Sequence, residues 1–166
     1  MNVVSGGNDG RQCIASRCTR ATADPQLVIA VARSWLGTPY HDQQSVRGVG
    51  CDCLGLARGI WREVLGPEPF PIPPYSRDWG EAGPVEVLAD GAHGCMIEVA
   101  ADDPPPGALL MFRMRERAIA KHVGILTDAA TMIHARERLG VIEEPFTQAW
   151  RRRLAFAFLY PQPRRR

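Results

Sequence analysis

The residue best placed for chemistry in this sequence is Cys53, which follows Asp52 at the expected start of a helix. The free backbone N–H groups and the dipole at a helix N-terminus stabilise an anion, so they lower the pKa of a thiol placed there. The carboxylate of Asp52 acts in the opposite direction because it repels a thiolate. A free cysteine also packs well in a core. Position alone therefore leaves two alternatives, a nucleophile and a buried core residue.

Two histidines lie twelve residues apart in the C-terminal third, His122 at the start of one expected strand and His134 in the next. An odd-membered loop centred on Asp128 places them directly opposite each other on one face, whereas an even-membered loop puts them on opposite faces. Directly opposed residues have Cβ atoms about 4.5–5.5 Å apart, which lets two imidazoles form a hydrogen bond. Two unrelated polar residues are the alternative.

A cysteine, a histidine base and a second histidine that orients the base can together carry out nucleophilic catalysis. The sulfur attacks a carbonyl carbon, and the histidine takes the thiol proton and later protonates the leaving amine. Backbone N–H groups at the helix start can hold the oxyanion. The spacings Cys13–Cys18 and Cys51–Cys53 fit structural zinc sites poorly. We therefore expect no metal and no other cofactor.

Two helices and a sheet must position these residues. The first helix begins after Asp24, a good N-cap, and ends at 37–39. The second helix begins near Asp52. Gly55 and Gly59 lower its helix propensity, so we expect both to lie where a sheet packs too closely for a side chain.

The rest of the chain divides into a proline-rich middle and a strand-rich end. Residues 66–107 hold nine of the 14 prolines, which predicts mostly loop, a short helix near 85–90 and one wall of a groove. Short apolar segments separated by turns predict strands at 109–113, 122–126, 131–135, 141–144 and 154–160. The fold class is therefore α+β, with N-terminal helices packed on an antiparallel sheet of about five strands.

Composition limits the class of protein. The chain has 166 residues and a net charge of +2, but residues 151–166 contain six arginines and no acid, so the remainder carries −4. A weakly acidic body with a basic tail does not predict specific nucleic-acid binding. The tail suits phosphate, an acidic wall polymer or an acidic protein, and a solvated tail is the alternative. We divide the chain into an extension, a domain and a basic tail, at 1–24, 25–160 and 161–166.

The cysteines and the apolar segments bear on where the protein is made. Five cysteines, an odd number, argue against a closed disulfide framework. Residues 1–24 lack the apolar core of a signal peptide, and no apolar run is long enough to span a membrane. We therefore expect synthesis in a reducing cytoplasm without membrane insertion, and another route of delivery if the protein acts outside the cell.

Five segments taken together are similar to a known family: "WLGTPY" (35–40), "GCDCLGL" (50–56), "PPGALLMF" (105–112), "KHVGIL" (121–126) and "MIHA" (132–135). Residues 25–160 resemble the NlpC-type bacterial cell-wall cysteine peptidases, which have a papain-like fold. The resemblance implies that Cys53 is the nucleophile, His122 the general base and His134 the orienting residue. It also implies that Tyr40 and Asp52 hold the amino end of the substrate, and that peptide bonds of the peptidoglycan stem are cleaved without a metal.

The proline-rich middle and the arginine-rich final strand resemble one subgroup, encoded in phage and prophage tail modules and in gene-transfer particles. This resemblance implies an endopeptidase that assembles with tail hub or baseplate proteins and is carried to the periplasmic cell wall. Two positions depart from the family pattern. Leu54 replaces a serine beside the nucleophile, and Ala108 replaces the aspartate of a P-G-D-L element.

Other functions remain open from the sequence. A structural tail or baseplate subunit that keeps the fold without activity is one alternative, and Leu54 favours it. A thiol acyltransferase or a different amidase is another, since a fold does not determine a reaction. The sequence assigns no role to three further cysteines, Cys13, Cys18 and Cys95. Trp35, Trp61 and Trp150 suit a core or a groove wall better than a sugar-stacking platform.

Overall fold

The computed structural model describes residues 21–75 and 85–163. The elements within these ranges are α1 (Pro25–Ser34), β1 (Ser45–Val46), β2 (Gly50–Cys51), α2 (Cys53–Leu65), α3 (Val87–Cys95), β3 (Ile97–Val99), β4 (Leu109–Phe112), β5 (His122–Leu126), β6 (Thr131–Arg136), β7 (Gly140–Pro145), α4 (Gln148–Arg151) and β8 (Leu154–Leu159). The fold is α+β, as the sequence predicts.

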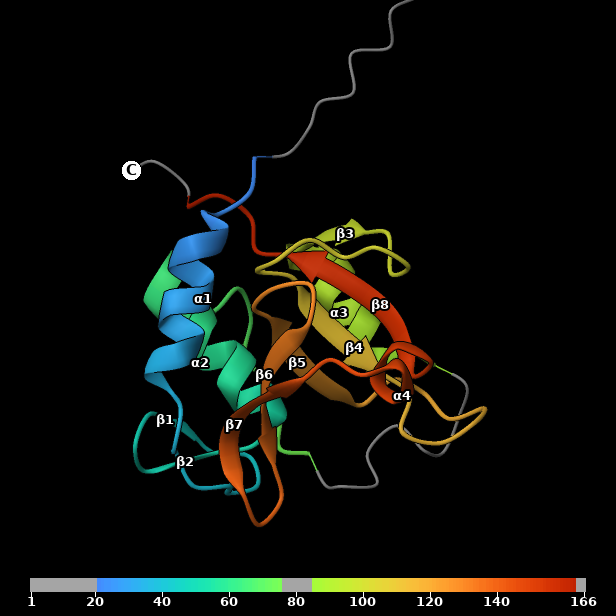
Figure 1. Cartoon of the computed structure of the whole chain (residues 1–166). Helices are drawn as coiled ribbons and strands as arrows, with labels where there is room; N and C mark the ends of the chain where they lie inside the picture. The colour runs from blue at the N-terminus through green and yellow to red at the C-terminus, as the bar shows by residue number, and fades with distance from the viewer. Residues whose placement is uncertain (1–20, 76–84, 164–166) are drawn as a thin grey trace, which may run out of the picture.

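A six-stranded antiparallel sheet forms the centre of the molecule, in the order β3-β8-β4-β5-β6-β7. Figure 1 shows α1 and α2 standing together beside the β5–β6 part of the sheet, with which α2 is in contact. The main core lies between the three longer helices and one face of the sheet. A smaller apolar cluster covers the other face, against Phe146 and Trp150.

Both predicted helix starts are confirmed. The side chain of Asp24 accepts a hydrogen bond from the Gln26 amide at 2.9 Å, and Asp52 accepts one from the Gly55 amide at 2.7 Å. Each carboxylate satisfies an amide that has no partner within its helix. The position of Cys53 in the first turn of α2 therefore follows from the residue before it.

The two glycines of α2 are close-packed, but not against a sheet as predicted. A methyl group at Gly59 would overlap the indole ring of Trp35, which follows α1. One at Gly55 would overlap the backbone carbonyl of Gln44, in the loop before β1. The first glycine sets the spacing of α1 and α2, and the second brings the 41–44 loop against the start of α2.

The five predicted strands are β4 to β8, and the sheet has one more strand than expected. The additional strand, β3, pairs with β8 at only three positions, too few for an alternating pattern to indicate it. The helix expected at 85–90 runs instead over Val87–Cys95. Its glycines, Gly91 and Gly94, weakened the sequence signal for its second half.

The two ends of the described chain lie at the same end of the molecule (Figure 1). The Ala23 amide donates to the Tyr160 carbonyl at 2.9 Å, and the Gln162 amide donates to the Ala21 carbonyl at 2.8 Å. Of the predicted extension and basic tail, residues 1–20 and 164–166 lie outside the described residues. In the part of the chain that is described, no helix has the length and apolar character needed to cross a membrane.

Candidate active site

The thiol of Cys53 lies at the start of α2 against the strand that begins with His122. Its Sγ donates to the carbonyl oxygen of Lys121 at 3.8 Å. The backbone amides of Val123, Leu54 and Cys53 itself lie close enough to the sulfur to act toward lowering the pKa of the thiol. The thiol therefore contacts the backbone on both sides of His122, at the end of the sheet where β5 begins.

A pocket of about 460 Å³ opens over this sulfur. Four of the five residues predicted for the site line it, namely Tyr40, Asp52, Cys53 and His122. The remaining lining residues come from the 42–43 loop, the first turn of α2, the proline-rich segment, the start of α3 and the 114–121 connection: Asp42, Gln43, Leu54, Tyr75, Leu88, Met114 and Lys121. The fold therefore gathers the predicted nucleophile, base and substrate-binding residues around one cavity.

His134, the fifth predicted residue, lies behind His122 and has no exposed surface. His122 Nε2 and His134 Nδ1 are 2.7 Å apart, and His134 Nε2 and Glu144 Oε1 are 2.9 Å apart. Three side chains from β5, β6 and β7 thus form a chain of hydrogen bonds that leads away from the pocket. The sequence interpretation named the first two and missed Glu144.

The two histidines share a face, but they are not directly opposite each other as predicted. The β5–β6 ladder pairs Ile125 with Ile133 and Leu126 with Met132, so its odd-membered loop is centred on Ala129, one residue beyond Asp128. His134 therefore faces Gly124, where a Cβ would lie 3.2 Å from the His134 Cβ. His122 reaches His134 diagonally, across the space that the glycine leaves open.

Trp150, in α4, supports all three members of this chain. Its ring stacks on His122 with centroids 5.7 Å apart and meets His134 edge to face at 5.1 Å. Its Nε1 donates to Glu144 Oε1 at 3.1 Å. The prediction that Trp150 is part of a core or groove wall is too general, because this indole holds two imidazoles and a carboxylate in one arrangement.

The hydrogen-bond chain determines which nitrogen of His122 can act as a base. A carboxylate only accepts hydrogen bonds, so the Nε2 atom of His134 must carry a proton and donate it in a hydrogen bond to Glu144. The Nδ1 of neutral His134 then accepts from Nε2–H of His122. Nδ1 of His122 is left without a proton, and it is the atom able to take one from Cys53.

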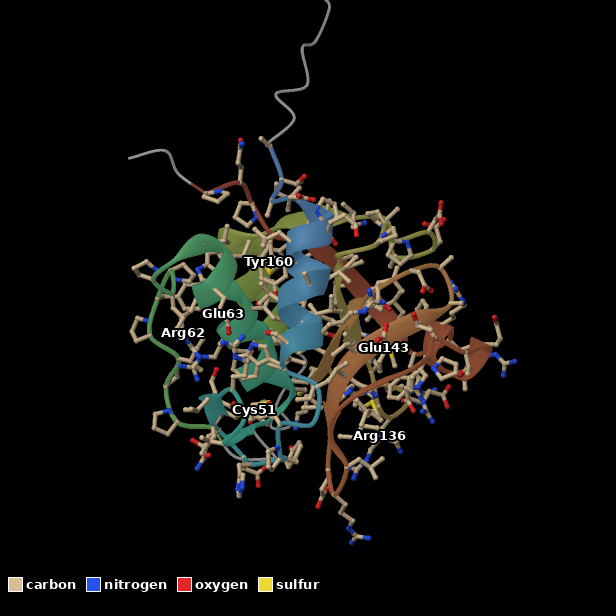
Figure 2. All side chains as sticks on the ribbon, turned by 60° about the vertical axis from the view of Figure 1, so that its left-hand side comes forward. Cys51, Arg62, Glu63, Arg136, Glu143 and Tyr160 are labelled. Atoms are coloured by element: carbon tan, nitrogen blue, oxygen red, sulfur yellow. The ribbon has the colours of Figure 1, made fainter. Side chains whose placement is uncertain are left out.

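Both imidazoles are neutral at physiological pH. Burial lowers the pKa of His122 to about 3, with help from the neighbouring His134 and Arg136, and Glu144 opposes the shift. Burial and then Arg136 lower the pKa of His134 to about 4. Arg136 reaches Glu144 Oε2 at 3.2 Å from the β6–β7 side of the molecule, where Figure 2 labels it. Desolvation thus outweighs the attraction of the nearby carboxylate.

The pKa of Cys53 is raised, to about 12, whereas the helix start was expected to lower it. Burial is the largest cause, and the charge of Asp52 adds to it; the three backbone amides act in the opposite direction and are outweighed. The free protein therefore holds a neutral thiol beside a neutral imidazole. We therefore expect proton transfer from sulfur to His122 to accompany attack on a carbonyl rather than to precede it.

Asp52 is almost fully buried and already has three donors. Besides the Gly55 amide, it accepts from the Gln43 amide at 2.7 Å and from the Tyr75 hydroxyl at 2.6 Å. Tyr40 donates to Asp42 at 3.2 Å, and burial raises the pKa of its phenol. Both predicted substrate-binding residues line the pocket, and their binding of a substrate amine stays a prediction.

Sequence reasoning missed three residues of the site, Glu144, Trp150 and Tyr75. Glu144 had a usable signal, because β6 and β7 form a hairpin in which His134 pairs with Ile142, so residue 144 returns to the same face. Trp150 and Tyr75 reach the site from a short helix and a loop, for which no periodic pattern exists. Among the described residues, no group of three or more His, Cys, Asp or Glu side chains is arranged to hold a metal ion.

A cysteine at a helix start beside histidines on an antiparallel sheet places this chain among proteins of papain-like fold. The chain belongs to the NlpC/P60 family, whose sequence profile matches residues 37–158. Among curated proteins, none matches the chain closely enough to count as a relative.

Solved structures support the same fold. An NlpC/P60 family protein from Bacillus cereus ATCC 10987 is 23% identical with a TM-score of 0.60, over 84% of this chain and 41% of that one. The NlpC/p60 domain of the peptidoglycan hydrolase SagA is 21% identical with a TM-score of 0.56, over 81% of this chain and 97% of that domain. A lipoprotein-like NLP/P60 protein from Staphylococcus aureus subsp. aureus Mu50 is 16% identical with a TM-score of 0.60, over 87% and 45%. The chain thus spans less than half of two of these relatives.

Proposed function

We propose that this protein is a cysteine endopeptidase that hydrolyses peptide bonds in the peptidoglycan stem. The observation that carries the proposal is the pocket that both Cys53 and His122 line, with His122 hydrogen-bonded through His134 to Glu144. Membership of the NlpC/P60 family supports it, as does the fold shared with a domain of a peptidoglycan hydrolase.

The residues of the pocket suggest a sequence of steps. Sγ of Cys53 attacks the carbonyl carbon while Nδ1 of His122 takes the thiol proton. The amides of Cys53 and Leu54, at the start of α2, would stabilise the oxyanion in this proposal. His122 then protonates the leaving amine, and water, deprotonated by the same nitrogen, hydrolyses the thioester. Glu144 stabilises the positive charge that His122 and His134 share during these transfers.

Incubation of the purified protein with cell-wall sacculi tests this proposal, with released muropeptides identified by mass spectrometry. We expect soluble stem fragments from the wild type and none from Cys53→Ala or Cys53→Ser. Cys51→Ala is the matched control, because Cys51 is buried in the core and does not line the pocket. Equal release by the Cys53 variants would exclude the mechanism. No release by any variant would favour a structural subunit that keeps the fold.

We further propose that a phage-tail-like particle carries the protein to the periplasmic wall, where hub or baseplate proteins are its partners. The support for this proposal is the resemblance of the proline-rich middle and the arginine-rich final strand to tail-module peptidases. Mass spectrometry of purified particles from the producing cells tests it directly. Particles that lack the protein, from cells that synthesise it, would overturn this part of the proposal and leave the peptidase proposal standing.

A further inference from the structure

A second cavity, which we call the apolar pocket, adjoins the catalytic one. It has a volume of about 370 Å³ and lies between α2, α3, the sheet and residues 68–75. Leu54, Tyr75 and Leu88 line both cavities. Because Leu54 directly follows Cys53, a group bound at the sulfur has a short path into the apolar pocket.

The polar side chains that line the apolar pocket are already paired with the protein. Arg58 and Glu68 form an ion pair at 2.8 Å, and the Tyr160 hydroxyl donates to the Ala57 carbonyl at 3.2 Å. The remaining polar groups donate elsewhere: Trp61 to the Pro67 carbonyl, Tyr75 to Asp52, and the Cys95 thiol to the Gly91 carbonyl. An occupant therefore gains hydrophobic burial and no new polar contact, which selects hydrocarbon.

The size of the apolar pocket points to a chain rather than to a single small side chain. An engineered cavity of about 150 Å³ already holds benzene, and this pocket is more than twice as large. Leu54 stands where the family usually has serine, so the wall between the two cavities is itself apolar. A substrate with only small or charged side chains would leave the apolar pocket unused.

We propose that the apolar pocket binds the hydrocarbon chain of an acyl ester or thioester whose carbonyl is attacked by Cys53. This inference goes beyond the proposed function and relies on the same nucleophile. A carbon–sulfur bond forms and the bond to the alcohol or thiol breaks, while His122 passes the thiol proton to the leaving atom. Water then attacks the acyl-enzyme and gives a proton to His122, which passes that proton to the sulfur as the carboxylic acid leaves.

The test is a series of p-nitrophenyl esters from acetate to decanoate. If each added methylene is buried, kcat/KM rises by roughly threefold to fourfold per methylene until the apolar pocket is full. The proposal would be overturned if the protein hydrolyses p-nitrophenyl acetate through Cys53 and its kcat/KM does not depend on the length of the acyl chain.

Two glycines of α3 provide matched variants. Gly91 lines the apolar pocket, and a Cβ there would lie 3.7 Å from Phe70, an ordinary contact. Gly94 is exposed and has no neighbour within 4 Å of its Cβ position. We expect Gly91→Phe to lower the ratio of kcat/KM for the octanoate ester to kcat/KM for the acetate ester at least tenfold. Gly94→Phe should leave this ratio unchanged. Equal ratios in the two variants would contradict the proposal, and Gly91→Leu provides a smaller plug should the phenylalanine impair folding.

A binding measurement separates this proposal from the proposed peptidase. Cys53→Ala cannot form an acyl-enzyme, but its apolar pocket is intact, so it should bind the fluorescent fatty acid cis-parinaric acid. Adding Gly91→Phe should abolish that binding. If the wild type hydrolyses neither sacculi nor esters and binding persists, the nucleophile fails and the apolar site stands. If peptide cleavage occurs without fatty-acid binding, the apolar site is refuted alone.

Discussion

The two sides of the catalytic pocket are each anchored by a carboxylate, and these carboxylates have different neighbours. Asp52, on the helix side, accepts from three uncharged donors: two backbone amides and the Tyr75 hydroxyl. Glu144, on the sheet side, contacts the guanidinium of Arg136, the indole of Trp150 and the imidazole of His134. The first carboxylate holds a loop and a helix start, and the second holds the base.

This difference has opposite consequences for ionisation. The charge of Asp52 raises the pKa of Cys53 and so disfavours the thiolate, whereas the charge of Glu144 favours a positive His122. Asp52 therefore fixes the position of Cys53 but makes its thiol less acidic. Glu144 offsets this effect because it stabilises the positive charge that His122 gains when it takes the proton. The predictions that follow test this division, beginning with the largest effect.

Removal of the base should have the largest effect. His122→Ala leaves no group to take the thiol proton, so we expect release of stem fragments from sacculi to fall by about three to four orders of magnitude. His93→Ala is the matched control, because His93 pairs with Glu98 and lines neither cavity. Similar activity of the two variants would show that His122 is not the base.

Neutralising the sheet-side carboxylate should have an intermediate effect. Glu144→Gln keeps the shape but removes the charge and allows an amide to donate to His134, which favours the wrong tautomer. Because Glu144 acts through two histidines, we expect kcat to fall on the order of 10-fold to 100-fold with little change in KM. A change confined to KM would place Glu144 in substrate binding instead.

Neutralising the helix-side carboxylate should increase thiol reactivity while weakening the fold. Asp52→Asn removes the negative charge beside Cys53, so alkylation by iodoacetamide at pH 8 should rise about tenfold for each unit by which the thiol pKa falls. The amide cannot accept from all three donors, so the free energy of unfolding should drop by about 1–3 kcal/mol. Peptide mass spectrometry measures the rate of Cys53 alkylation. An unchanged rate in Asp52→Asn would contradict the role assigned to Asp52.

The two buried imidazoles should make stability depend on pH. Their pKa values, about 3 and about 4, lie below the 6.5 of an unfolded histidine, so the unfolded chain binds protons that the folded chain excludes. The free energy of unfolding should therefore fall as pH falls from 6.5 toward 4, by up to about 1.4 kcal/mol per pH unit for each imidazole. When the free energy of unfolding is measured by urea titration at several pH values, it should depend less steeply on pH in His134→Asn than in the wild type. An unchanged dependence on pH would show that folding does not exclude a proton from His134.

The smallest effect is expected for Arg136, whose side chain is 46% exposed. Its charge lowers the pKa of both histidines, so Arg136→Gln should move the acid limb of the pH–rate profile to higher pH. Solvent screening should keep the shift below about one pH unit. A shift toward lower pH would mean that Arg136 acts on the histidines mainly by positioning Glu144.

The sequence predicts elements better than it predicts how they meet. Asp24 and Asp52 mark the two helix starts because capping is local, and the strands that carry His122 and His134 are apolar enough to identify. The diagonal register of the two histidines depends on a loop centred on Ala129, which Asp128 shapes by accepting from two later amides. The pKa of Cys53 depends on burial by other elements of the fold, and the position of a residue at a helix start does not indicate how deeply it is buried. Local rules thus located the reactive groups and misjudged their environment.

Gly124 has a consequence for judging related sequences. A methyl group there would lie 3.1 Å from the Ile133 carbonyl and 3.2 Å from the His134 Cβ, so β5 and β6 would have to move apart by a few tenths of an ångström. A homologue could thus keep the cysteine and both histidines and still lose turnover through one small substitution. A survey of relatives that considers only the reactive residues would classify such an inactive homologue as an enzyme.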